Sequence, residues 1–122
     1  MRGAGAVMEE MNEVFESVAK YFSLLSDPTR LRIMHTICQD EKSVNQIADE
    51  AGATQPNVSR HLGMLHQAGV LSRRREGSQM FYRVTDMAFT DICRTVCIRV
   101  AGELDGSKTL KRSFKNVIDV LG

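Results

Sequence analysis

Apolar residues recur every three or four positions along most of this chain, which is the spacing of one face of an α-helix. Near the N-terminus this stripe consists of Met8, Met11, Phe15, Val18, Phe22 and Leu25. The stripe predicts a helix over residues 8–25. Asp27 and Pro28 are expected to begin a new helix, because aspartate is a good N-cap and proline suits the first turn of a helix. A second helix is therefore expected from Pro28 to about Cys38.

The middle of the chain holds two shorter helical patterns separated by a tight turn. Ser43 and Gln46 have the spacing of a capping box, so a third helix is expected to begin there and to end at Gly52. Thr54 is the expected N-cap of a fourth helix, and Gly69 has the place of a left-handed residue after its end. The buried stripe of this fourth helix is expected to be Val58, Leu62 and Leu65. This succession predicts a helix-turn-helix.

The helical pattern gives way to strand-like alternation after the fourth helix. Residues 70–73 and 80–84 alternate as strands do, and residues 76–79 are expected to form the turn of a hairpin. A fifth helix, capped by Thr85-Asp86, should run to about residue 101. A sixth should follow a break at residues 105–107, with Leu110, Phe114, Val117, Ile118 and Leu121 on its apolar side. The pattern predicts a mainly α-helical winged helix-turn-helix with a small β-hairpin. We expect residues 1–122 to form a single domain whose terminal helices dimerise.

Composition narrows the class of protein. The 122 residues are 43% hydrophobic and 25% charged, as in ordinary globular domains. No apolar run approaches the ~20 residues of a membrane span, and the N-terminus lacks the apolar centre of a signal peptide. Three cysteines without a secretion signal favour free thiols. We therefore expect a cytoplasmic location and no membrane partner. No nucleophile–base arrangement or glycine-rich phosphate loop is present, so we expect no enzyme activity.

The distribution of charge is more informative than the net charge of +1. Between residues 54 and 83, five arginines against one glutamate give a local charge of +4. Between residues 1 and 26, two basic residues against four acidic ones give −2. One face is therefore expected to meet phosphate.

The polar side of the fourth helix and the arginine-rich hairpin are the predicted DNA-binding surface. Gln55 and Asn57 suit adenine, Arg60 suits guanine or phosphate, and His61 is open between a backbone contact and simple exposure. Of the three consecutive arginines, alternation places Arg73 and Arg75 on one face of the strand, with Arg74 on the other. The full predicted set is Ser43, Thr54, Gln55, Asn57, Ser59, Arg60, His61, Arg73, Arg74, Arg75, Ser78 and Gln79.

These motifs together resemble those of the ArsR/SmtB family of winged-helix transcriptional repressors. The resemblance is carried by LLSDPTRLRIMHTI, ATQPNVSRHLGMLHQAGVL and RRREGSQMFYRV, and it extends over about residues 15–100. It implies a homodimer that binds near-palindromic double-stranded operator DNA and is released by an effector, often a metal ion. Interface candidates on the stripes are Met8, Met11, Phe15, Phe89, Val96, Val100 and Phe114.

Two metal sites that the resemblance would imply are missing. Where arsenite sensors of the family carry Cys-x-Cys, residues 42–46 contain no thiol. The four places of the family's zinc ligands align with Asp86, Ala88, Arg99 and Gly102. One carboxylate does not provide the four ligands that zinc requires, so neither site is expected here.

The remaining candidates for effector chemistry are Cys38, Cys93 and Cys97. Cys93 and Cys97 are one helical turn apart and face the same side, which would suit As(III) or another soft metal ion. The family's oxidant and sulfur sensors pair cysteines at places that align with His35 and Ala101, about one turn away from Cys38 and Cys97. Plain packing of the three thiols is an equally open interpretation, because free cysteine is often buried.

Two other functions stay open at this point. A winged helix can bind protein instead of DNA, and such a module would show no salt-sensitive binding to a duplex. The chain could also be a repressor without an effector, in which the cysteines are purely structural.

Overall fold

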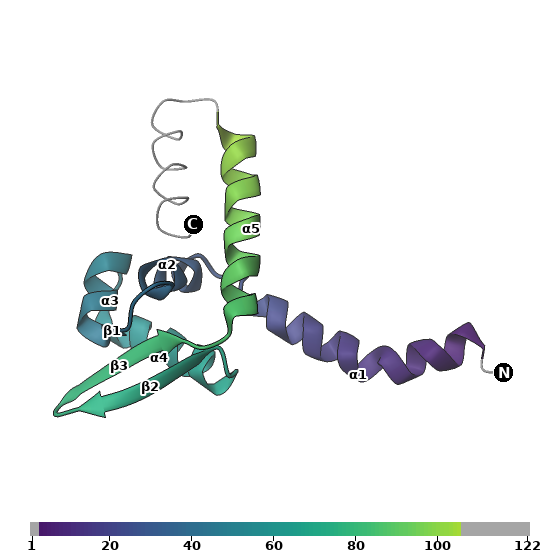
Figure 1. Cartoon of the computed structure of the whole chain (residues 1–122), viewed down its shortest axis with the longest axis horizontal. Helices are drawn as coiled ribbons and strands as arrows, with labels where there is room; N and C mark the ends of the chain where they lie inside the picture. The colour runs from purple at the N-terminus through teal and green to yellow at the C-terminus, as the bar shows by residue number, and fades with distance from the viewer. Residues whose placement is uncertain (1–2, 106–122) are drawn as a thin grey trace.

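The computed structural model describes residues 3–105, which form five helices, a small sheet and their connections (Figure 1). The helices are α1 (Ala4–Ser23), α2 (Pro28–Ile37), α3 (Val44–Ala51), α4 (Gln55–Gln67) and α5 (Met87–Leu104). The strands are β1 (Lys42–Ser43), β2 (Leu71–Glu76) and β3 (Gln79–Val84). The mainly helical fold with a hairpin is confirmed. The sixth predicted helix lies outside the described residues.

Local capping chemistry sets the starts of α2, α3 and α5 and the end of α3. The Asp27 carboxylate accepts a hydrogen bond from the Arg30 amide at 3.0 Å and so caps α2. Both hydrogen bonds of the predicted capping box open α3, and Gly52 ends it with a positive φ of 66°. Thr54 is the N-cap residue of α4, as predicted, but its side chain makes no capping hydrogen bond.

The hairpin strands are longer, and their turn is tighter, than the alternation predicted. Glu76 pairs with Gln79 across the hairpin, so the turn consists only of Gly77 and Ser78, with Gly77 at a φ of 62°. The sheet order is β1-β3-β2, antiparallel throughout. Strand β1 was not predicted, because two residues carry no recognisable alternation.

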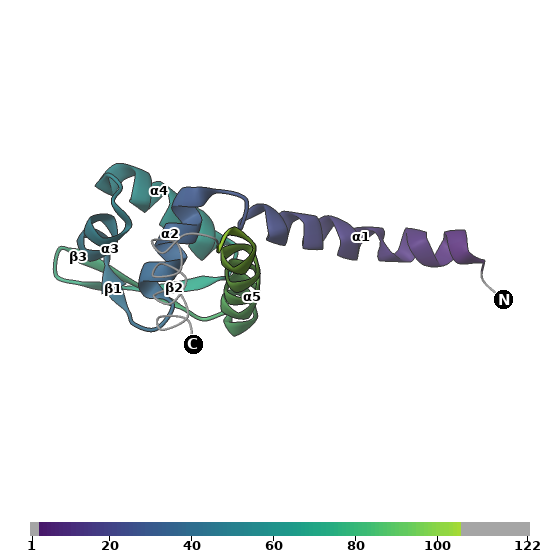
Figure 2. The ribbon, with the colours of Figure 1, turned by 90° about the horizontal axis from the view of Figure 1, so that it is seen from above.

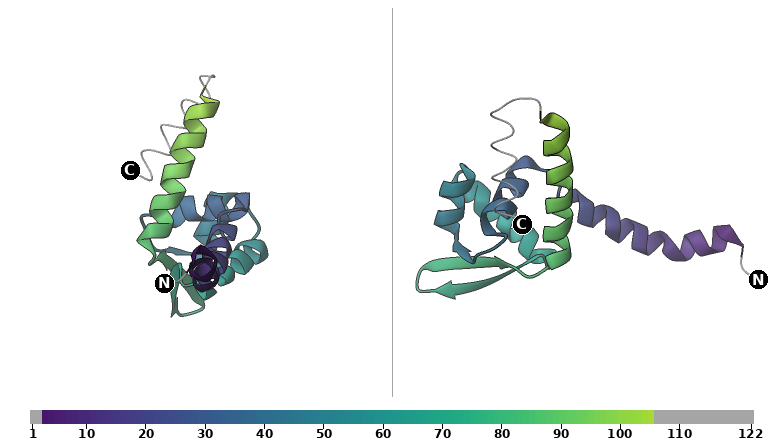
Figure 3. Two further views of the ribbon diagram at one scale, coloured as in Figure 1. Left: turned by 90° about the vertical axis from the view of Figure 1, so that its right-hand side faces the viewer. Right: turned by 45° about the horizontal axis from the view of Figure 1, so that its top comes forward.

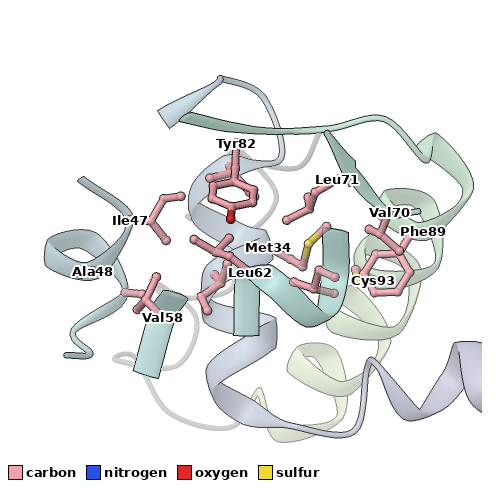
Figure 4. Close-up of a cluster of buried hydrophobic side chains, with 14 residues drawn as sticks. Met34, Ile47, Ala48, Val58, Leu62, Val70, Leu71, Tyr82, Phe89 and Cys93 are labelled. Atoms are coloured by element: carbon pink, nitrogen blue, oxygen red, sulfur yellow. The ribbon is translucent and has the colours of Figure 1, made fainter. Parts of the chain in front are cut away.

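The core lies between α2, α3, α4, the hairpin and the start of α5, as Figure 4 shows. Its fully buried large side chains are Phe89, Ile33, Ile37, Ile47, Leu62, Leu65, Val58 and Val70. The prediction that Phe89 is an interface residue was wrong. Its ring is fully buried and meets the Tyr21 ring edge-on at 5.4 Å between centroids, so it joins α5 to the end of α1.

Helices α1 and α5 project from this body in different directions (Figures 1, 2 and 3). Helix α1 begins four residues earlier than predicted, and it has no buried side chain at all. Its exposed large apolar residues are Val7, Met8, Met11, Val14, Phe15, Val18 and Phe22. On α5, Met87, Val96, Val100 and Leu104 are exposed as well. Among the described residues, no helix is long and apolar enough to cross a membrane.

Candidate nucleic-acid interface and effector pocket

The N-terminal half of α4 presents a polar face to solvent. Thr54, Gln55, Ser59 and Arg60 are exposed, and Asn57 is half-buried. The Arg60 guanidinium donates a hydrogen bond to the Asn57 side-chain oxygen at 2.8 Å, which orients both groups. The stripe that includes Val58 packs into the core, as predicted. This face therefore carries donors and acceptors suited to base edges and phosphates.

His61 and Ser43 do not belong to this exposed face. The His61 side chain was expected to be exposed or to touch a DNA backbone, but only 3% of its surface is accessible, since it faces Asp27 and Arg30 at the start of α2. Burial lowers the pKa of His61, and the nearby Arg60 and Arg30 lower it further, whereas Asp27 opposes them. Ser43 is also buried, and its hydroxyl is used in the capping box of α3. We leave both residues out of the DNA-contact set.

Arg30 joins the end of α1 to α4 through His61. Its guanidinium donates to the carbonyl of Leu24 at 2.9 Å and to that of Ser23 at 3.0 Å. The same group lies 3.3 Å from His61 Nδ1, while Arg60 lies 3.4 Å from His61 Nε2. The C-terminal end of α1 is thus linked to a residue of the polar face. The linkage of α1 to α4 by Arg30 was not predicted, because the sequence alone does not distinguish Arg30 from an ordinary exposed cation.

The three arginines of β2 have different partners. Arg74 pairs with Glu41 and Glu76, both at 2.7 Å, and lies over the Phe81 ring at 4.6 Å. These carboxylates raise the pKa of Arg74 and neutralise its charge locally.

Arg73 and Arg75 lie on the opposite face of the strand, as the alternation predicted. Both are exposed, and neither has an ion pair with a described residue. Ser78 and Gln79 are exposed at the tip of the hairpin. Strand β2 therefore offers two of its three arginines to an anion.

The three cysteines form no disulfide, and they line one pocket of about 330 Å³ against α2 and α5. Burial raises the pKa of each thiol, and it raises that of Cys93, helped by Cys97 and Cys38, to about 12. Neutral thiols therefore predominate near pH 7. Residues 3–105 contain no group of three or more His, Cys, Asp or Glu side chains placed to hold a metal ion. The prediction of a soft-metal site finds no preformed geometry here.

The geometry of the helices and the hairpin defines a class of protein. A helix-turn-helix with an exposed polar face on its second helix, followed by a β-hairpin with free arginines, is a winged-helix DNA-binding domain.

Comparison with known proteins identifies the family. A family model described as "Bacterial regulatory protein, arsR family" matches residues 27–73. The probable mercury resistance operon repressor of Streptomyces lividans is 36% identical over 77 residues, which are 63% of this chain and 62% of that protein. The chain thus spans slightly less than two thirds of the length of that relative.

Two solved structures have the same fold. The transcriptional repressor BigR from Xylella fastidiosa is 31% identical, with a TM-score of 0.64 over 73% of this chain and 91% of that one. A homodimeric winged helix-turn-helix domain from Mycobacterium bovis is 25% identical, with a TM-score of 0.67 over 79% and 89% of the two chains. The protein belongs to the ArsR family of bacterial regulatory proteins.

Proposed function

We propose that this protein is a homodimeric repressor that binds double-stranded operator DNA through α4 and the wing and is released by an effector. The observation that carries the proposal is the exposed N-terminal half of α4 beside two exposed arginines, Arg73 and Arg75, that have no ion pair with a described residue. The helix would enter the major groove, while the arginines would contact phosphates or the minor groove. With DNA as its partner, we expect the protein to act in the cytoplasm.

The exposed apolar stripe of α1 supports the homodimer. Its seven large apolar residues fall on one side of the helix, whereas Glu9, Glu13, Glu16 and Lys20 lie on the other. A helix of 20 residues with no fully buried side chain, which meets the core only near its C-terminal end through Tyr21, gains little from the monomer. A second copy that covered this stripe would stabilise α1. The dimer would then place two α4 helices with their wings, here called the two heads, on one duplex, with half-sites about 34 Å apart.

The position of the cysteine pocket supports release by an effector. Its walls come from α2, which carries Arg30, and from α5, whose outward side bears exposed apolar residues such as Val96 and Val100. A ligand between these helices could shift α5, with its exposed apolar side, relative to α2. The same shift would move Arg30 and so change its linkage to α4. An equilibrium between two dispositions of the heads can be shifted only by a ligand that binds one of them better.

The DNA-binding proposal is tested by the salt dependence of binding. We would measure fluorescence anisotropy of a duplex from the region upstream of the protein's own gene, between about 50 and 200 mM salt. Arg75→Ala is expected to weaken binding to all duplexes and to reduce the slope of log K against log salt by roughly 0.9, the loss of one phosphate contact.

Arg74→Ala is the matched control, since it removes the same charge from the same strand. Because Glu41 and Glu76 already neutralise Arg74, we expect the slope to be nearly unchanged. Equal changes in slope for the two variants would contradict the assignment of Arg75. Absence of any salt-sensitive binding to duplex DNA would instead favour a winged-helix module that binds protein.

A further inference from the structure

The pocket between α2 and α5 is shaped for a small molecule. Its volume of about 330 Å³ is at the lower end of the range for ligand sites. Most of the wall is apolar or sulfur, from Leu31, Met34, Cys38, Cys93 and Cys97. The polar and charged residues that complete it are Arg32, His35, Thr36, Glu50 and Thr90. This pocket is separate from the polar face of α4 and from the wing.

Thr90 is one of the polar residues of this wall, and it differs from Thr36 in that its hydroxyl has no described partner. Its side chain is only 8% exposed, and its hydroxyl oxygen is fully buried with no hydrogen-bond partner among the described residues. A buried hydroxyl without a partner costs about 1–3 kcal/mol. A ligand whose hydrogen-bonding group reached this hydroxyl, by a small shift of the wall that opened it to the cavity, would recover that cost.

The charges around the pocket argue against an ionic ligand. Arg32 and Glu50, the two charged residues that line it, are solvent-exposed, and Glu50 already pairs with Lys42 at 2.7 Å. The three thiols are neutral near pH 7, because burial raises the pKa of each one. An anion in this cavity would lose its hydration and gain only the exposed Arg32, whose charge is screened by solvent, as a counter-charge.

We propose that this pocket binds an uncharged, largely apolar small molecule that carries one hydrogen-bonding group, with Thr90 as its polar contact. That such a ligand is the effector rests on the proposed function; its binding to the protein does not.

A pair of fluorescent probes tests the proposal on the reduced protein without DNA. N-Phenyl-1-naphthylamine is uncharged and carries one N–H donor, and 8-anilino-1-naphthalenesulfonate adds a sulfonate to a similar framework. We expect the uncharged probe to bind saturably, with one site per protomer, and the sulfonate to bind at least tenfold more weakly. Equal affinity for the two probes, or no saturable signal from the first, would overturn the proposal.

Variants on α5 locate the site. Thr90→Val keeps the shape of the side chain but removes the hydroxyl, and it is expected to weaken the uncharged probe about fivefold to tenfold. Thr95→Val makes the same change at an exposed position of the same helix, and it should bind the probe like the unaltered protein. Cys97→Leu should abolish binding by filling the pocket. If Thr90→Val and Thr95→Val behave alike, Thr90 is not the contact.

Two further readouts keep the outcomes distinct. Circular dichroism and the anisotropy assay identify a variant that has simply unfolded, in which case the comparison rests on the Thr90 and Thr95 pair. As(III) is added in parallel, with protection of the three thiols from alkylation as the readout. Protection of all three by As(III), without any binding of the uncharged probe, would replace the proposed ligand with a thiolate-bound metalloid.

Discussion

In this protein, burial affects the hydrogen bonding and the protonation of single side chains as much as neighbouring charges do. Thr90 and the three cysteines lie in an apolar wall, where a hydroxyl loses its hydrogen bonds and a thiol keeps its proton. Natural proteins accept such local costs mainly where a site requires them. Two measurements on the protein without ligand follow from this environment.

Thr90→Val is expected to raise the free energy of unfolding by about 1 kcal/mol, because an apolar methyl group replaces a buried hydroxyl that has no described partner. Urea denaturation at pH 7 measures the change. Thr95→Val, at an exposed position, should stay within about 0.5 kcal/mol of the unaltered protein. A loss of stability in Thr90→Val would mean that the hydroxyl is satisfied in solution.

Alkaline pH should destabilise the fold through Cys93. The folded chain holds the thiol proton up to a pKa of about 12, whereas the unfolded chain releases it near the ordinary thiol pKa of 9.0. The unfolded state therefore binds fewer protons in this window, so stability is complete below pH 9 and falls as the pH rises above it.

Denaturation from about pH 7.5 to about pH 10.5 tests this expectation against Cys93→Ala. The pKa values of Cys38, Cys97 and Tyr21 are raised too, so the unaltered protein should lose stability through several groups. The variant should show a shallower loss. Identical pH profiles would show that Cys93 ionises equally in both states.

At the scale of elements, one acidic residue both starts α5 and joins it to α1. Asp86 accepts a hydrogen bond from the Phe89 amide at 3.2 Å, and its other oxygen accepts one from the Tyr21 hydroxyl at 2.8 Å. The cap was expected from sequence, but the bond to Tyr21 was not.

Asp86→Ala is expected to cost about 2–3 kcal/mol of stability, since it removes the cap and leaves the half-buried Tyr21 hydroxyl without this acceptor. Tyr21→Phe removes only the second interaction and should cost about 1 kcal/mol. Thermal or urea denaturation gives both values. Equal costs for the two variants would show that the cap itself contributes nothing.

These elements separate what the sequence can predict from what it cannot. Helices, caps and the alternation of the arginines depend on neighbours within four residues, and residues 27–52 and 71–84 therefore reveal them. The burial of His61 and the pairing of Arg74 with Glu41 depend on segments about 30 residues apart. From the local pattern alone, His61 is predicted to be an exposed polar residue and Arg74 an exposed cation. The same limit hid strand β1, which exists only because β3 lies beside it.

For the whole molecule, the decisive surface is the apolar side of α1. Phe15 is exposed on that side, while Glu16, the next residue, faces away from it. Phe15→Lys is expected to convert the dimer to monomers and to weaken operator binding by tenfold or more, because a buried cation without a partner is costly in an apolar contact.

Glu16→Lys introduces the same residue one position later on the polar side, and it should remain a dimer. Sedimentation equilibrium at micromolar concentration measures the mass, and anisotropy measures DNA binding. If the unaltered protein is itself a monomer in this range, the homodimer is wrong. If Phe15→Lys remains a dimer, the contact lies elsewhere, for example along α5.

The hydrogen bonds from Arg30 to the carbonyls at the end of α1 make a stiff joint between that helix and the body of the protein. A stiff joint at this point restricts which spacings of the two DNA half-sites the protein can bind. Two heads held at a fixed separation read half-sites that lie on the same side of the double helix, and they cannot stretch to follow a change in phase. An operator lengthened by about 5 base pairs, half a helical turn, would turn one half-site to the far side of the duplex. Lengthening by a full turn would restore the side but not the distance, so the joint predicts that neither altered spacing supports two-headed binding.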